Sequence, residues 1–190
     1  AFNTGFGYDF RFGKKYGLIY NQVGFNLTTY DVRPNFQQRL EQNPLLEKSF
    51  QNSFFSGLFF KDISFYFQSD NGPKRTNWAF ISKLELSGME IFLANKAYNA
   101  IGGSNDTWRF NDNTDFEKYV RLDIDGRWFR RIYRKSQLAV RAKAGIAIPY
   151  GEQDAVVSYI KQLLVGGPSS IRGWRPMELG PGTYNHDSSN

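Results

Sequence analysis

The stretch Tyr119-Val-Arg-Leu-Asp-Ile-Asp-Gly-Arg-Trp128 alternates apolar and charged side chains almost without interruption. Successive side chains of a β-strand point to opposite faces of the sheet, so the alternation predicts a strand with one apolar and one ionic face. Five charged residues share the ionic face within residues 117–127. A soluble sandwich rarely places so many charges on one face, whereas a transmembrane β-barrel with a water-filled lumen accepts them.

The same alternation recurs along the chain. From Leu138 to Ile148 the even positions are apolar, and Arg141 and Lys143 lie between them. The segment 54–68 has apolar residues in both registers, so we expect a bulge near Lys61 and Asp62 to switch its face. The predicted strands are residues 5–12, 16–28, 54–68, 77–92, 116–133 and 137–149.

The predicted connections alternate in length. Short ones occupy residues 13–15, 69–77 and 134–137, and long ones occupy 29–53, 93–115 and everything after Tyr150. Tight periplasmic turns and long extracellular loops give this alternation in an outer membrane barrel. About eight strands are the minimum for closure, so we expect residues 1–190 to be a fragment of one barrel domain or to be completed by another chain. A short helix is expected within 35–48.

The composition agrees with an all-β transmembrane antiparallel barrel. Aromatic residues make up 17% of the chain, yet its mean hydropathy is −0.52, as expected when lipid-facing and lumen-facing residues average out. No run approaches the roughly 18 to 20 apolar residues of a membrane helix. Cysteine is absent and His186 is the only histidine, so we expect no metal site, no cofactor and no enzyme activity. The net charge of +6 is dispersed along the strands, which disfavours nucleic acid as a partner.

A motif follows the last predicted strand. Its parts are Leu163–Val165, Gly166-Gly167, Ile171-Arg172-Gly173-Trp174 and Gly180-Pro181. This arrangement resembles the signature loop of the BamA/TamA family of outer membrane proteins, also called the bacterial surface antigen family. Trp174 stands where Phe or Tyr is more usual, and the stretch from Arg175 onward is similar to the Bacteroidota versions.

The resemblance implies a position for the loop at residues 150–190. It would fold back into the barrel and carry Arg172 to the inner wall, where a guanidinium binds carboxylates with fixed geometry. The usual acidic partner lies on a later strand that this chain lacks. The candidate lumenal partners here are Glu117, Arg121, Asp123 and Asp125. The chain would correspond to strands six to eleven of sixteen, without the other strands and the periplasmic POTRA repeats.

The resemblance also implies a function in the outer membrane of Gram-negative bacteria, namely protein assembly, insertion or translocation without covalent chemistry. Partners would be membrane lipid, unfolded outer membrane proteins, and accessory lipoproteins or periplasmic proteins. Three alternatives stay open: an export barrel for a secreted partner or surface lipoprotein, a conducting pore, and a soluble β-sandwich binding module. The charges at 121–127 could form a catalytic carboxylate pair, but a salt-bridged lumen lining is the preferred interpretation. Trp78, Trp128 and Tyr150 are candidates for interfacial aromatic girdles.

Overall fold

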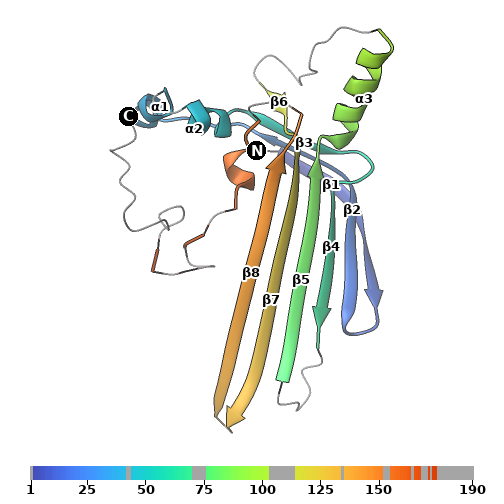
Figure 1. The fold of residues 1–190 in the computed structure, drawn as a ribbon, viewed down its shortest axis with the longest axis vertical. Helices are drawn as coiled ribbons and strands as arrows, with labels where there is room; N and C mark the ends of the chain where they lie inside the picture. Colours follow the sequence, from blue (N-terminus) through green and yellow to red (C-terminus); the bar gives the residue numbers. More distant parts are fainter. Residues whose placement is uncertain are drawn as a thin grey trace.

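A computed structural model describes residues 2–41, 44–69, 76–102, 114–133, 135–151, 155–163, 165–167, 171 and 173–174. Most of them form one sheet (Figure 1). Its strands are β1 (Phe2–Phe12), β2 (Tyr16–Thr28), β3 (Ser53–Gly57), β4 (Asp62–Gln68), β5 (Thr76–Ser87), β6 (Asp115–Phe116), β7 (Tyr119–Tyr133) and β8 (Ser136–Pro149).

The strands pair in an up-and-down order. β1 pairs with β2, and the series continues through β4, β5, β7 and β8, with every one of these pairings antiparallel. The short β3 and β6 extend the sheet at one end, where β3 pairs with β2 and β6 lies parallel to β3. Among the described residues β1 and β8 do not pair, so the sheet is an open part of a barrel. The predicted fold class is confirmed.

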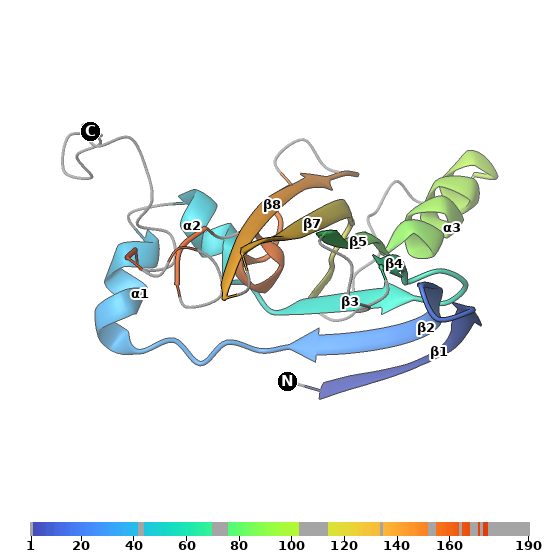
Figure 2. The same ribbon diagram turned by 90° about the horizontal axis from the view of Figure 1, so that it is seen from below.

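Two irregularities bend the sheet, and both lie beside residues 21–24 of β2. The predicted strand 54–68 is divided into β3 and β4, which pair with successive parts of β2 on either side of residues 58–61. Opposite this break, the register shifts between Phe6 and Gly7. Bulges increase local bending. Beyond them β1, β2 and β3 swing across the inner side of the other strands (Figure 2).

The predicted end of the strand at residues 77–92 is wrong. β5 stops at Ser87, and α3 (Met89–Ala100) begins after Gly88, whose φ of 69° is left-handed. This φ favours glycine and interrupts the strand, and the residues that follow are mostly good helix formers. The Glu90 carboxylate accepts hydrogen bonds from the backbone N–H groups of Phe59 and Phe60, both at 3.2 Å. The helix is therefore tied to the break between β3 and β4.

Two other strand starts also differ from the prediction. The first strand begins at Phe2 because its pairing with β2 extends to Leu27. The strand expected from residue 116 begins at Tyr119, and Asp115–Phe116 instead form β6 beside β3. Tyr150, a predicted girdle residue, packs against Phe92 with ring centres 5.4 Å apart, and its hydroxyl donates to the Ser87 carbonyl at 2.6 Å.

The connections separate by length, as predicted. The β1–β2 and β7–β8 turns lie at one end of the sheet, and α1 (Pro34–Glu41), α2 (Pro44–Ser49), α3 and β6 lie at the other (Figure 1). The helix expected within 35–48 is present as α1 and α2. No helix in the described ranges is long and apolar enough to cross a membrane.

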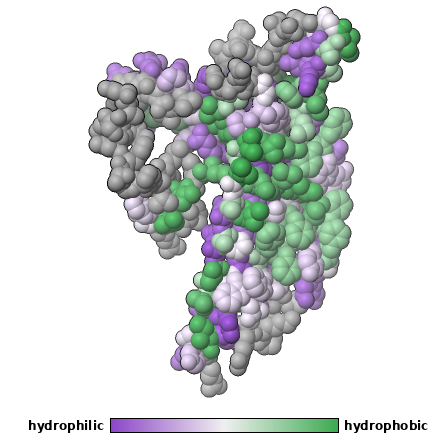
Figure 3. Space-filling model, in the orientation of Figure 1, coloured by the Kyte–Doolittle hydropathy of each residue, from purple (hydrophilic) through white to green (hydrophobic). Residues whose placement is uncertain are grey.

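Little of the molecule is a conventional core. The buried apolar cluster consists of Phe55, Tyr119 and Val157, on the inner side of the sheet near the helices. The opposite, outer face leaves apolar side chains exposed, and hydrophobic residues gather on the face of the sheet seen in Figure 3. Ile124 is 36% exposed there, and no second sheet covers this face in the described part of the chain. The described strands therefore form one open sheet and not the two packed sheets of a β-sandwich.

Candidate functional site

Alternation places most charges of the four adjacent strands β4, β5, β7 and β8 on the inner face of the sheet. Between β5 and β7 the register sets charges of opposite sign side by side: Lys83 is opposite Asp123, and Glu85 is opposite Arg121. On the other side of β7, Asp125 is opposite Lys143. Opposite charges on neighbouring strands stabilise the pairing, whereas like charges would weaken it. The inner face is thus a charge-compensated surface.

Arginines hold both aspartates of β7. The Asp123 carboxylate accepts from Arg121 Nε at 2.8 Å. The Asp125 carboxylate accepts from Arg127 Nη2 at 3.0 Å and from Arg141 Nη2 at 2.6 Å. A guanidinium therefore neutralises each carboxylate. This geometry agrees with a salt-bridged lining better than with a general acid and base.

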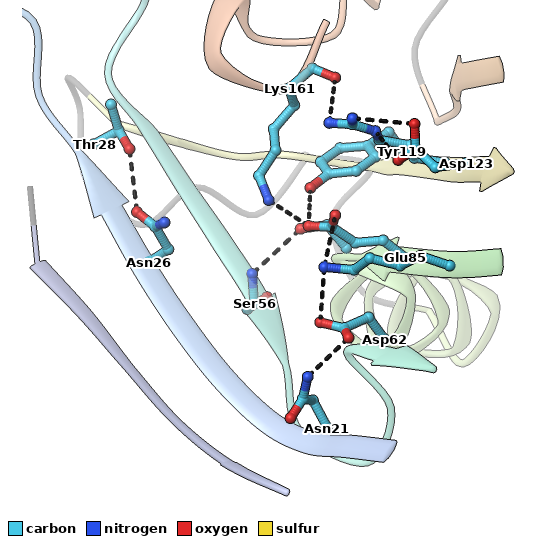
Figure 4. A network of polar contacts seen from close by, with 12 residues as sticks. Asn21, Asn26, Thr28, Ser56, Asp62, Glu85, Tyr119, Asp123 and Lys161 are labelled. Atoms are coloured by element: carbon cyan, nitrogen blue, oxygen red, sulfur yellow. Dashed lines mark hydrogen bonds and ion pairs between the residues drawn. The ribbon is translucent and has the colours of Figure 1, made fainter. Parts of the chain in front are cut away.

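A deeper network is centred on Glu85, which is 5% exposed. Its Oε1 atom accepts from the Tyr119 hydroxyl at 2.7 Å and from Lys161 Nζ. On its other side, Lys83 Nζ lies 3.9 Å from Glu85 Oε2 and 3.6 Å from Asp62 Oδ2. Asn21 Nδ2 completes the chain of contacts with a 2.8 Å bond to Asp62 (Figure 4). The network links β2, β4, β5 and β7 to a segment that follows β8.

Residues 155–163 form that inserted segment, which includes the single-turn helix η1 (Tyr159–Lys161). Arg121 Nη1 donates to the Lys161 carbonyl at 3.0 Å. Lys161 Nζ also lies 5.3 Å from the centre of the Phe55 ring, within cation–π range. Val157 completes the small core, and the Ser158 hydroxyl lies 3.0 Å from that of Tyr30. The inserted segment is thus bound to the inner wall along its length.

Glu117 supports the same segment from the connection between β6 and β7. Its carboxylate accepts from the Ser53 hydroxyl at 2.7 Å. Burial raises the pKa of the Glu117 carboxyl, and the hydrogen bonds from Ser53 and the Ser158 backbone oppose this rise. Glu117 therefore already has partners on β3 and on the inserted segment.

A comparison of the chain with models of protein families gives a match. The Omp85 superfamily domain matches residues 3–189, nearly the whole chain. The chain belongs to the Omp85 superfamily. Members are outer membrane β-barrel proteins that assemble or transport other proteins without enzymatic activity. The resemblance to the BamA/TamA family is supported at this superfamily level. No curated protein sequence and no solved structure matches the chain.

The Omp85 domain contains the predicted signature residues, of which some can be placed. Gly166 and Gly167 have φ values of 112° and 83°, which favour glycine, and the Gly167 N–H donates to the Trp174 carbonyl at 2.7 Å. Ile171 and Trp174 are exposed, and so is Gly173. Arg172, Gly180 and Pro181 lie outside the described residues. The pairing of Arg172 with Glu117, Arg121, Asp123 or Asp125 therefore stays a prediction.

Sequence reasoning did not single out the Lys161–Glu85 contact of this Omp85 domain. A signal was present, because Lys161 is the only charged residue between Ala155 and Gly167. A lone charge in an otherwise uncharged segment that becomes buried requires a partner of opposite sign. Within the described ranges, no group of three or more His, Cys, Asp or Glu residues could hold a metal ion.

Proposed function

We propose that this Omp85 domain is part of the wall of a BamA/TamA-like barrel that inserts or translocates outer membrane proteins without covalent chemistry. The observation that carries the proposal is the inserted segment bound to an ionic inner face by Lys161 and Arg121, while the outer face of the same strands is apolar and exposed. Membership of the Omp85 superfamily supports it.

The physical task of such a barrel is to lower the cost of bringing strands into lipid. Each backbone group left without a hydrogen bond in hydrocarbon costs several kcal/mol. A barrel that offers a strand edge and a hydrated interior lets an incoming strand pair before it meets lipid. Neutralised charges suit this interior, because they hold water without a strong field of one sign. No nucleotide or metal is required.

The proposed partners follow from this task. They are the lipid of a Gram-negative outer membrane, unfolded outer membrane proteins as substrates, and accessory lipoproteins or periplasmic proteins that deliver them. The inserted segment would separate the lumen from the exterior while the wall acts on a substrate. The narrower role of a dedicated exporter would use the same wall.

The test is reconstitution of the full-length parent protein in phospholipid vesicles with an unfolded β-barrel substrate. Folding is followed by the shift to a heat-modifiable band on a gel. The proposal predicts folding at least about tenfold faster than in vesicles without the protein. An unchanged rate would contradict it. Entry of a soluble passenger into the protease-protected interior, with no gain in barrel folding, would favour an exporter instead.

A further inference from the structure

The outer face carries a hollow that extends from the middle of the strands towards the end with the short turns. Phe80, Gly126 and Ala142 are opposite one another on β5, β7 and β8. In this row a large aromatic side chain, Phe80, is followed by two very small residues, Gly126 and Ala142, which leave the surface hollow. In the next row towards the turns, Trp78, Trp128 and Val140 stand opposite one another. Together with Phe67, Ala79 and Arg127, these six residues line a groove of about 420 Å³.

No described part of the protein fills this groove. A Cβ atom built on Gly126 would meet only the Ala142 carbonyl oxygen, at 3.9 Å, so packing does not require a glycine there. Trp78 is 55% exposed and Val140 is 48% exposed. The two indole rings, with centres 6.1 Å apart, border the groove on the side of the turns. The groove is thus an open apolar channel on a surface that, in an Omp85 barrel, faces lipid.

One cationic side chain lies on the outer face one row beyond the groove, on the side of the turns. Arg130 follows Trp128 by two residues and therefore lies on the same face. Its neighbours in the register are the uncharged Thr76 and Leu138. Among the described residues, Arg130 is the only charged one on the outer face of β5, β7 and β8, and it is exposed.

The position of these groups matches the layers of a membrane. Tryptophan is enriched at the level of lipid headgroups, and an arginine near that level can extend its charged end to the headgroups while its stem lies on apolar surface. Short turns mark the periplasmic end of an outer membrane barrel. A guanidinium binds a phosphate through two parallel hydrogen bonds. Along the membrane normal, the apolar groove and the Arg130 cation therefore follow each other as an acyl chain and its phosphate do in a phospholipid.

We propose that this groove binds one anionic phospholipid of the periplasmic leaflet. One acyl chain lies over Gly126 and Ala142 beside the two indole rings, and the phosphate contacts Arg130. Two observations favour a lipid over a protein partner: the groove is continuous with the lipid-facing surface, and the only charged side chain that this face presents beside it is the Arg130 cation. Arg127 also borders the groove, but its side chain binds Asp125 on the inner face.

The test is native mass spectrometry of the full-length protein in detergent, with phosphatidylglycerol or phosphatidylethanolamine added. Gly126→Leu adds an apolar side chain to the groove at a position where a Cβ atom has open space, and we expect it to lower retention of phosphatidylglycerol about tenfold. Arg130→Gln removes the cation, and we expect it to abolish the preference for phosphatidylglycerol. Two controls should bind as the wild type does. Thr4→Leu adds a leucine to the outer face of β1, and Arg131→Gln makes the same change on the opposite face of β7.

Several results would overturn the proposal. Equal retention by all variants would indicate ordinary boundary lipid, and equal binding of the two phospholipids by the wild type would exclude headgroup recognition. A dimer mass lost only in Gly126→Leu would assign the groove to a second copy of the chain. Heat-modifiable migration of each variant identifies folded protein, so unfolding is not mistaken for lost binding. The measurement involves no assembly substrate, so it can fail independently of the proposed function.

Discussion

The inner and outer faces of the sheet reverse the usual relation between polarity and burial. On the inner face, Asp62 and Glu85 are 3% and 5% exposed. On the outer face, Phe6, Trp78 and Ile146 are each more than half exposed. In soluble proteins carboxylates are almost never fully buried, and large apolar residues usually are. The comparison teaches that each face is matched to its own surroundings, with lipid taking the place of a core.

The largest effect is expected from breaking the inner network at its centre. Glu85→Ala leaves Lys161 and Tyr119 without their shared acceptor in a buried setting. Loss of one partner of a buried ion pair costs about 3–5 kcal/mol. Denaturant unfolding of the full-length protein in vesicles measures the change.

A double-mutant cycle separates this contact from a general effect of truncation. If the Lys161–Glu85 pair carries the cost, Glu85→Ala combined with Lys161→Ala should destabilise the protein by less than the sum of the two single changes. Strict additivity would contradict the contact. Asp125→Asn is a matched control, since the arginine partners of Asp125 are more exposed, and we expect it to cost at most about 1 kcal/mol.

The outer face is tested by a charge placed on it. Ile124→Arg puts a guanidinium into the lipid-facing side of β7, where the cost is about 2–4 kcal/mol near the middle of the membrane. Ile81→Arg is the matched control, because Ile81 lies on the inner face opposite Asp125. Unfolding free energies in vesicles should fall for the first variant and change little for the second. Equal losses would remove the distinction between the two faces.

Two glycines sharpen the same comparison. A Cβ atom on Gly145 would lie 2.9 Å from Leu163 of the inserted segment and 3.0 Å from Asp123 Oδ1. Gly145→Leu should therefore push the segment from the wall, at a cost of about 1–3 kcal/mol, and speed its cleavage in limited proteolysis. Gly126→Ala on the outer face has open space and should do neither. Unchanged proteolysis of Gly145→Leu would place the segment elsewhere.

The smallest effect is a pH dependence at Glu117. A carboxyl whose folded pKa is raised contributes stability that is complete below its unfolded pKa and is lost as the pH rises through the folded pKa. Glu117→Gln keeps an acceptor for Ser53, so it should be more stable than the wild type at neutral pH, with a smaller decline between acid and neutral pH. Denaturant midpoints at several pH values measure this. Glu47→Gln, on the exposed surface of α2, should leave the midpoints unchanged.

The sequence predicted the strands and the faces of their side chains, because both depend on the alternation of neighbouring residues. Alternation from Tyr119 to Trp128 gave the strand and its two faces, because a period of two determines which side chains share a face. The end of β5 was missed because Phe92 continues the apolar pattern past Gly88, and only the backbone angle of that glycine reveals the stop. The Lys161–Glu85 contact joins residues 76 positions apart. Local patterns do not specify which distant carboxylate a lysine will meet.

The most direct measurement is the accessibility of spin labels along β7 in vesicles. This chain has no cysteine, so single cysteines at Leu122, Asp123, Ile124 and Asp125 can each carry one label. If the outer face of β7 meets lipid and its inner face meets water, labels at 122 and 124 should collide mainly with lipid-soluble oxygen. Labels at 123 and 125 should collide mainly with a water-soluble nickel complex. Similar collision rates at all four positions would contradict it.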